Sequence, residues 1–305
     1  MSAPLVVCVG LCVVDLILAV DRVPQTAGKF FADASVESPG GPAATAAAAI
    51  ARLGGRARFV GRLGGDTRGD RIVSVLEAAG VEVDVERLAD LSSPVSAVLV
   101  TPDGERTIVN HTDARLFATP PPATAFAGAD AVLADARWPL GAVAAMDRAA
   151  ASGVPGILDL DLVPAADVDA FWPAVHAATH VVASAPGLAA LVPGTGESDG
   201  GSLASMTGGW VAVTAGSEGV HWAGGHLAPP GVRAVETLGA GDVFHGAFAL
   251  ALAEGSSEEH ALRFASAAAA VRCSRTGGWS ALANRTEVEL LMEETWSPQQ
   301  DSSGG

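Results

Sequence analysis

Short apolar runs recur along the chain and alternate with alanine-rich stretches. The runs are continuously apolar, so each predicts a strand buried on both faces; they lie at Leu5–Val9, Ala131–Leu133, Ile157–Leu160, His180–Ala183 and Trp210–Thr214. The stretches between and after them predict helices at Pro42–Leu53, Gly69–Ala79, Leu140–Ser152, Ala240–Ala253, Ser257–Cys273 and Thr286–Glu294. Strands that alternate with helices in this way indicate a parallel sheet covered on both faces.

Two segments interrupt this alternation. Val13–Val36 and Val95–His111 predict extended strands with turns, and Pro102-Asp103-Gly104 in the second segment is a hairpin signal. Both segments leave the α/β pattern and re-enter it, so we expect a small β-sheet lid. The expected division is a lid of residues 13–36 and 95–111, a core of residues 1–12, 37–94 and 112–296, and a flexible polar tail at residues 297–305.

Composition narrows the possible partners. The 305-residue chain is 49% apolar, which allows a substantial core, and its formal net charge is −16. That acidity argues against nucleic acid, whose binding relies on basic surface. Three cysteines without metal spacing favour a reduced, cytoplasmic setting. The apolar run from Leu5 to Val20 is interrupted by Gly10 and Asp15, so it predicts neither a membrane span nor a signal peptide.

The segment Glu236–Gly246 carries the most specific candidate chemistry. Its turn of Gly239, Ala240 and Gly241 lets the backbone come close to a ligand, and the amides at the start of the following helix can hold an anion. Asp242 stands beside this anion hole, where a carboxylate can take a proton from a hydroxyl. Phosphoryl transfer to an alcohol needs both features. The competing interpretation is that Asp242 merely caps the helix.

Other polar residues are expected at the same edge of the sheet. Asp15, Arg137 and Asp161 each follow a predicted strand, and ligands of open α/β sheets bind beyond the carboxyl ends of the strands. Arg137 could instead form an ion pair with Asp135 or Asp161. Lys29 is the single lysine of the chain, and its plain alternative is a solvated surface residue. His245 is expected to pack on its helix, and Trp138 either lines the site or packs.

Several motifs, taken in order, resemble those of the ribokinase-like (phosphofructokinase B) family of sugar and nucleoside kinases. They are Gly10-x-x-x-x-Asp15, Gly40-Gly41 before a helix, Gly65-Asp66-x-x-Gly69, Val213-Thr214-x-Gly216-x-x-Gly219 and Gly239-Ala240-Gly241-Asp242. The resemblance covers about Leu5 to Thr295. It implies a Rossmann-type three-layer α/β core with a mostly parallel sheet and a β lid. It also implies transfer of the ATP γ-phosphate to a hydroxymethyl group, usually with Mg²⁺.

The resemblance also assigns roles. Asp242 is the implied catalytic base, Gly239, Ala240 and Gly241 form the implied anion hole, and Asp15 and Gly41 belong to the implied sugar site. The residues implied to contact the nucleotide are Ser184, Thr214, Gly216, Gly219, Ala270, Cys273 and Gly278. Two positions depart from the family pattern. Thr45 stands where a sugar-contacting Asn is usual, and Ser184-Ala185-Pro186-Gly187 replaces the usual Asn-x-x-Glu, which leaves the metal ligands unknown.

Further segments look like the 6-deoxy-6-sulfofructose kinase subgroup, among them Gly28-Lys29, Ala134–Trp138, Pro186–Leu188, Arg263–Ser266 and Cys273–Gly278. The subgroup implies that Lys29, Asn110 and Arg137 contact the sulfonate. Lys and Arg suit a permanent anion because they supply charge-assisted donors, but a phosphosugar or an aldonate would satisfy the same groups. Kinases for a neutral sugar or a nucleoside, such as fructokinase, ribokinase or adenosine kinase, are the nearest alternative. A non-catalytic nucleotide or sugar sensor is the remote one. Exposed strand edges of the lid favour a homodimer.

Overall fold

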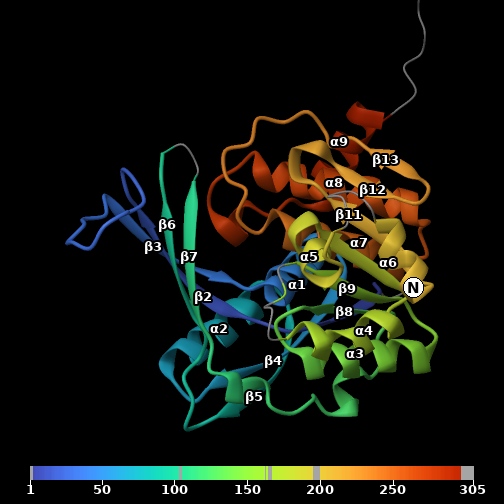
Figure 1. The fold of residues 1–305 in the computed structure, drawn as a ribbon, viewed down its shortest axis with the longest axis horizontal. Helices are drawn as coiled ribbons and strands as arrows, with labels where there is room; N and C mark the ends of the chain where they lie inside the picture. Colours follow the sequence, from blue (N-terminus) through green and yellow to red (C-terminus); the bar gives the residue numbers. More distant parts are fainter. Residues whose placement is uncertain (1–2, 103–104, 162, 164–166, 195–199, 297–305) are drawn as a thin grey trace, which may run out of the picture.

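The computed structural model describes residues 3–102, 105–161, 163, 167–194 and 200–296. These residues form a nine-stranded sheet with the strand order β13-β12-β11-β10-β9-β8-β1-β4-β5 (Figure 1). Neighbours from β5 to β11 are parallel, and β12 and β13 add an antiparallel edge. The strands are β1 (Leu5–Val9), β4 (Arg56–Gly64), β5 (Glu82–Leu88), β8 (Ala131–Asp135), β9 (Gly156–Leu160), β10 (His180–Ser184), β11 (Trp210–Thr214), β12 (Val220–Trp222) and β13 (Gly225–Leu227).

Helices cover both faces of this sheet, each over its own apolar core. Val6 and Cys8 of β1 point into one core and Val7 and Val9 into the other, which is why the strand is continuously apolar. The first core lies under α1 (Pro42–Arg52), α2 (Thr67–Ala78), α7 (Ala240–Ala253), α8 (Glu258–Cys273) and α9 (Arg285–Trp296). The second lies under α3 (Pro139–Ser152), α4 (Val168–Ala177), α5 (Ala185–Leu191) and α6 (Gly200–Thr207). The predicted three-layer α/β fold is confirmed.

The element predictions hold where the pattern is continuous. The ranges of β1, β11 and α7 agree with the predicted ones at both ends. The sequence analysis missed β4 and β5, whose charged residues interrupt the apolar pattern: β4 is RARFVGRLG and the edge strand β5 is EVDVERL. Helices α4 to α6 and the short strands β12 and β13 were missed as well.

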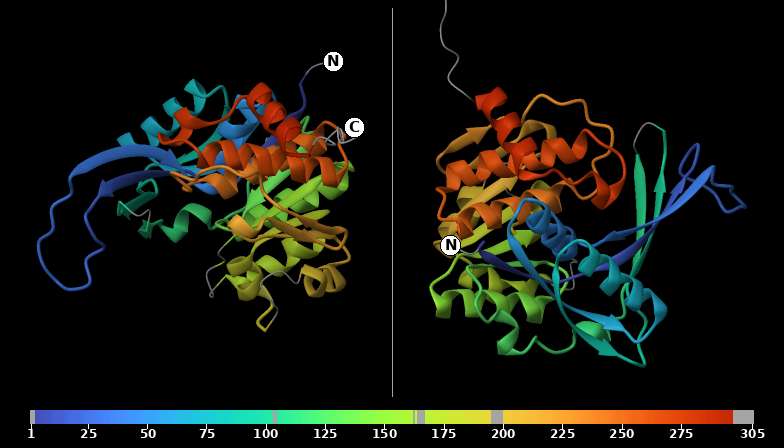
Figure 2. Two further views of the ribbon diagram at one scale, coloured as in Figure 1. Left: turned by 90° about the horizontal axis from the view of Figure 1, so that it is seen from above. Right: turned by 180° about the vertical axis from the view of Figure 1, so that it is seen from behind.

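A second, four-stranded sheet forms the lid, with the order β3-β2-β6-β7. Its strands are β2 (Val13–Ala19), β3 (Ala34–Gly40), β6 (Val95–Val100) and β7 (Arg106–His111). Both views of Figure 2 show this sheet projecting from the side of the core. The predicted end of the first lid segment, residue 36, falls inside β3, which continues to Gly40. Of the predicted hairpin turn, Asp103 and Gly104 lie outside the described residues.

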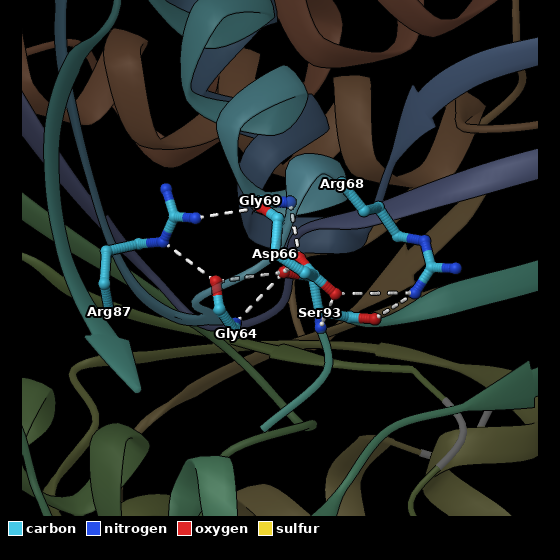
Figure 3. Close-up of polar contacts among 6 residues, drawn as sticks. All are labelled: Gly64, Asp66, Arg68, Gly69, Arg87 and Ser93. Atoms are coloured by element: carbon cyan, nitrogen blue, oxygen red, sulfur yellow. Dashed lines mark hydrogen bonds and ion pairs between the residues drawn. The ribbon is translucent and has the colours of Figure 1, made fainter. Parts of the chain in front are cut away.

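The Gly65-Asp66-x-x-Gly69 motif fastens the lid to the core (Figure 3). Asp66 caps α2 by accepting from the Gly69 amide at 2.9 Å, and it accepts from the Ser93 hydroxyl at 2.6 Å and the Ser93 amide at 2.9 Å. Ser93 lies two residues before β6. Burial acts to raise the pKa of Asp66, but these hydrogen bonds and the charge of Arg68 lower it overall. The motif therefore has a structural role at the base of the lid.

Within the part of the chain that the structure describes, no helix combines the length and apolarity needed to cross a membrane.

Candidate active site

The glycine-rich turn and the first turn of α7 form the centre of the candidate site. Gly239 has a φ of 77°, in the left-handed region that favours glycine, and the helix begins directly after it. The Val243 amide donates to the Gly239 carbonyl at 3.0 Å, which closes the first turn. The first amides of a helix have no acceptor within the helix, so this end can hold an anion. Asp242 lies within the same turn, as predicted.

Asp242 has the electrostatics of a base poised near neutral pH. It keeps some solvent-exposed surface, yet burial of its carboxyl is the largest cause that raises its pKa to about 7. The negative charges of Asp159, Asp161 and Asp135 raise the pKa further, while His245 opposes them. A carboxylate with a pKa near the working pH is well suited to general base catalysis.

A polar row crosses all four strands of the lid and contains Asp15. Strand register places Ser38, Asp15, Ser96 and Asn110 side by side on β3, β2, β6 and β7. Ser96 donates to the Asn110 side-chain oxygen at 2.7 Å. Burial raises the pKa of Asp15, and a hydrogen bond with Ser96 opposes that effect. Two predicted sugar-site residues, Asp15 and Asn110, are therefore brought into one row.

The two glycines after this row keep the lid close to the core. A Cβ atom added at Gly40 would lie 2.1 Å from a carboxylate oxygen of Asp15. Gly41 has a φ of 96°, and a Cβ atom added there would lie 2.4 Å from the Leu11 carbonyl oxygen. Gly41 therefore requires glycine, and a side chain at Gly40 would displace the Asp15 carboxylate. Gly41 precedes α1, whose first amides share this end of the sheet.

Thr45, which stands where a sugar-contacting Asn was expected, has a structural contact instead. It is buried on α1, and its hydroxyl accepts from the Trp279 ring nitrogen at 3.1 Å. A Cβ atom added at Gly239 would lie 3.5 Å from the Thr45 methyl group. Thr45 therefore packs directly against the glycine-rich turn and joins it to the segment after α8.

Asp135 at the end of β8 joins three backbone segments at the carboxyl edge of the sheet. One of its carboxylate oxygens accepts from the amides of Leu11 at 2.8 Å and Ala43 at 3.1 Å, and the other from the Arg137 amide at 2.8 Å. The Arg137 guanidinium lies 3.5 Å from the Asp161 carboxylate. The ion pair with Asp161, which the sequence analysis gave as an alternative role for Arg137, is therefore formed. Trp138 is buried beneath the Arg62 guanidinium and beside Phe117, which makes it a packing residue.

The lid also contacts the segment that leads into the glycine-rich turn. Arg106 of β7 donates to the Thr237 hydroxyl at 2.6 Å, two residues before Gly239. This hydrogen bond between a charged donor and a neutral acceptor is solvent-exposed, and it connects the lid directly to the core. Lys29, by contrast, is exposed in the loop between β2 and β3, and that loop extends away from the core in Figure 2.

The first residues predicted to contact the nucleotide lie at or just after the ends of β10 and β11. Ser184 and Thr214 are register neighbours at the ends of these parallel strands. The Ser184 hydroxyl accepts from the Gly187 amide at 3.0 Å and so caps α5, and the Thr214 hydroxyl donates to the Ala183 carbonyl at 3.3 Å. The turn after β11 needs its glycines, since Gly216 and Gly219 have φ values of 55° and 92°.

The remaining predicted nucleotide residues lie at and after the end of α8. The Cys273 carbonyl accepts from the amides of Val235 at 2.8 Å and Glu236 at 3.1 Å, which joins this helix to the segment before the glycine-rich turn. Ala270 is buried one turn earlier. Gly278 has a φ of 56°, and a Cβ atom there would lie 2.7 Å from the Ser38 hydroxyl, so this turn borders the polar row of the lid.

An ion pair between a buried arginine and a partly exposed glutamate reinforces the same junction. Arg272 of α8 is 2% exposed and pairs with Glu236, which also accepts from the Gly277 amide at 3.1 Å. The second guanidinium nitrogen of Arg272 donates to the Arg275 carbonyl at 3.0 Å. Glu236 thus connects three segments: the entrance to the glycine-rich turn, the end of α8 and the turn before Gly278.

The sequence analysis missed one pair next to Asp242. Asp159 of β9 and His245 of α7 are both buried, and the His245 Nδ1 atom lies 3.2 Å from an Asp159 carboxylate oxygen. The other His245 ring nitrogen contacts the Val182 carbonyl at 3.3 Å. His245 was expected only to pack on its helix. The one available signal was an aspartate within an otherwise apolar strand, Gly156–Leu160.

The doubly covered parallel sheet and its β lid form the architecture that the sequence resemblance implied, and comparison with known proteins identifies the family. Residues 3–285 match the pfkB family carbohydrate kinases. The ribokinase of Bacillus subtilis is 31% identical over 293 residues, 93% of this chain and 98% of that protein. The ATP-dependent ribose-1-phosphate kinase of Halopiger xanaduensis is 32% identical over 274 residues, 88% of this chain and 91% of that protein.

A solved structure shows the same architecture. Arabidopsis thaliana ribokinase complexed with ribose and ATP matches with a TM-score of 0.78 at 26% identity, covering 96% of this chain and 99% of that one. The chain therefore belongs to the pfkB family of carbohydrate kinases and is an ATP-dependent kinase.

Proposed function

We propose that Asp242 is the catalytic base of this kinase and that the turn Gly239–Gly241 holds the transferred phosphoryl group. The observation that carries the proposal is the carboxyl of Asp242 in the first turn of α7, where burial and neighbouring acids raise its pKa to about 7. In the reaction, the acceptor hydroxyl would lose its proton to Asp242 as its oxygen bonds to phosphorus. The bond between that phosphorus and ADP breaks, and the helix amides stabilise the charge in flight.

Replacing the base tests this part directly. Asp242→Asn keeps the shape of the side chain but cannot accept the proton, so kcat should fall by ~10²–10⁴ while nucleotide affinity changes little. Equal activity of the variant and the wild-type protein would remove Asp242 from the mechanism.

The proposed nucleotide site lies along the ends of β10 and β11 and the end of α8. Ser184, Thr214, Gly216 and Gly219 would flank the phosphates and one side of the base. The other side would meet the segment of Ala270, Cys273 and Gly278, which joins the glycine-rich turn through the Cys273 carbonyl. This arrangement leads the triphosphate toward Gly239–Gly241, as the reaction requires.

Mg²⁺ fits this site as part of the nucleotide substrate. Among the described residues no group of three or more His, Cys, Asp or Glu side chains could hold a metal, and the Ser184 hydroxyl is engaged as a helix cap. Mg²⁺ commonly keeps several waters and binds through substrate phosphates. We therefore propose that it enters with ATP, where it would supply positive charge to the phosphates.

For the acceptor, we propose the primary hydroxyl of an anionic ketose, with 6-deoxy-6-sulfofructose, converted to its 1-phosphate, as the best candidate. Asp15, with Gly41 beside it, would orient the sugar hydroxyls. Arg137 after the carboxyl end of β8 and Asn110 on the lid row would contact the sulfonate, and the loop of Lys29 between β2 and β3 would have to move toward the core to supply the third donor. The support is local: Arg137 places a guanidinium just after the carboxyl end of β8, where its side chain is 24% exposed.

A neutral pentose is the second candidate, because the ribokinase of Bacillus subtilis aligns along nearly the whole chain. A panel of ribose, fructose, fructose 6-phosphate, sulfofructose and adenosine with ATP separates these acceptors. Absence of turnover across the panel would instead favour a non-catalytic sensor.

Variants identify the anion contact. Arg137→Ala and Lys29→Ala should raise KM for anionic sugars several-fold and leave KM for neutral ones unchanged, since only the anion loses a charge-assisted hydrogen bond. Arg148→Ala, an exposed arginine on α3, is the matched control. Equal effects on charged and neutral sugars would refute the anion contact.

We further propose a cytoplasmic homodimer assembled through the lid. Both outer strands of the lid expose apolar side chains, with Val36 of β3 59% and Val109 of β7 65% exposed. Unpaired strand edges and exposed apolar groups favour association with a second copy. A monomer mass in light scattering would refute the dimer.

The proposed cytoplasmic location has separate support, because the free thiols of Cys8, Cys12 and Cys273 suit a reducing compartment.

A further inference from the structure

Two histidines face each other at the antiparallel edge of the nine-stranded sheet, apart from the residues assigned to the reaction. His221 of β12 and His226 of β13 are register partners across the hairpin, and such partners have Cβ atoms ~4.5–5.5 Å apart. Their ring centroids lie 4.4 Å apart, with 31° between the ring planes. His226 is exposed and His221 is half-buried, so solvent reaches the pair.

A hydrogen bond fixes how the His226 ring can act. The Nε2 atom of His226 lies 2.6 Å from the Glu218 carbonyl oxygen, which can only accept, so Nε2 carries the proton and donates it to this bond. The Nδ1 atom of the neutral ring then has its lone pair available for a ligand. Metal-binding histidines usually donate their other ring N–H to a carbonyl or a carboxylate, which orients the ring and raises the basicity of the ligating nitrogen.

The chemistry of two imidazoles favours a transition-metal ion. Imidazole suits Zn²⁺, Ni²⁺ and Cu²⁺, whereas Mg²⁺ prefers oxygen ligands. A tetrahedral ion with bonds of ~2.0–2.1 Å places two ligand nitrogens ~3.3 Å apart, which small rotations of two rings at this separation can reach. Within the described ranges, no third His, Cys, Asp or Glu side chain completes a cluster, so water would fill the remaining coordination positions.

We propose that His221 and His226 chelate one divalent transition-metal ion on the β12–β13 hairpin, with Nδ1 as the ligand atom of His226. The site differs from that of the Mg²⁺ proposed to enter with ATP, because its donors are nitrogens of the protein rather than phosphate oxygens. Its hydrogen bond to Glu218 reaches the turn that holds Gly216 and Gly219. The metal site stands whether or not that turn contacts the nucleotide.

Isothermal titration calorimetry of the tag-free, full-length protein with Ni²⁺ tests the proposal. Excess Mg²⁺ is present throughout, so that sites made of carboxylate oxygens are already occupied. Under these conditions the wild-type protein should bind one Ni²⁺ per chain at the pair. His221→Gln and His226→Gln should each weaken this binding at least ~10-fold, since changes in the second shell alone weaken metal sites by ~10–100-fold.

His260→Gln is the matched control, because it removes an exposed histidine from α8, outside the hairpin, and should leave the binding unchanged. The proposal is overturned if the wild-type protein does not bind Ni²⁺. It is also overturned if both pair variants bind Ni²⁺ as tightly as the wild type, or if His260→Gln weakens the binding as much as they do.

A second measurement needs only the wild-type protein, so it decides even if a variant does not fold. Cu²⁺ is paramagnetic and broadens the NMR signals of nuclei close to it. With substoichiometric Cu²⁺, the assigned backbone amide signals of residues 220–227 should broaden before those of the rest of the chain. Broadening that begins around another histidine would contradict the assignment of the metal to this hairpin.

Discussion

The ion pair between Glu236 and Arg272 offers a sharp test of how the site is held together. Arg272 is 2% exposed, and Glu236 also holds the Gly277 amide at 3.1 Å. Glu236→Ala removes the only carboxylate paired with this guanidinium among the described residues. The positive charge of the Arg272 guanidinium cannot be hydrated where it lies. The variant must therefore either keep an uncompensated buried cation or open the end of α8.

The expected loss of stability in Glu236→Ala follows from these two outcomes. Removing one partner of a buried ion pair typically destabilises a protein by ~3–5 kcal/mol. For a chain of 305 residues, an unfolding entropy of ~2.1 cal/mol/K per residue gives ~0.6 kcal/mol/K in total. A loss of ~3–5 kcal/mol therefore lowers Tm by about 5–8 °C. Glu236→Asp, which keeps the charge on a shorter side chain, should lose less.

Thermal unfolding followed by circular dichroism measures the effect, with Glu259→Ala as the matched control. Glu259 forms an exposed i,i+4 pair with Arg263, and such pairs contribute ~0.3–0.5 kcal/mol. Because Glu236 also holds the entrance to the glycine-rich turn, KM for ATP should rise in Glu236→Ala alone. If Glu236→Ala melts at the same temperature as Glu259→Ala, the buried pair does not stabilise the protein as argued.

Two further predictions concern the lid. Asp66→Ala should cost ~1–2 kcal/mol at pH 7, since it removes the cap of α2 and both contacts to Ser93. The pKa of Asp66 is lowered in the folded protein, so this stabilisation is present above the unfolded pKa of about 4 and is lost as pH falls further. Urea unfolding at pH 7 and pH 3 should therefore show a gap from wild type that narrows in acid, and a constant gap would contradict this reasoning. Arg106→Ala should raise KM for the acceptor about 3- to 10-fold with Tm unchanged, because only the exposed contact with Thr237 is lost. Unaltered steady-state kinetics would show that this contact does not hold the lid.

Much of the candidate site could be predicted because its motifs are local. Gly239 and Asp242 are three residues apart, and the turn and the helix entrance follow from that spacing alone. The continuous apolar runs likewise located β1, β8, β9, β10 and β11. Thr45 was identified as a departure from the family pattern, but its hydrogen bond to Trp279 spans more than two hundred residues and has no local signature.

The sequence by itself determined where the continuously apolar strands and the alanine-rich helices form, since apolar periodicity and glycine act between near neighbours along the chain. It also marked Asp242 and the glycine-rich turn. Only the tertiary structure decided that Asp159 meets His245, that Arg272 is buried against Glu236, and that Arg137 lies beside Asp161. Those pairings depend on how the strands are ordered in the sheet and how α7 and α8 pack on it. Burial then turns ordinary side chains into groups with shifted pKa values, because desolvation acts on a charge only after the chain has folded around it.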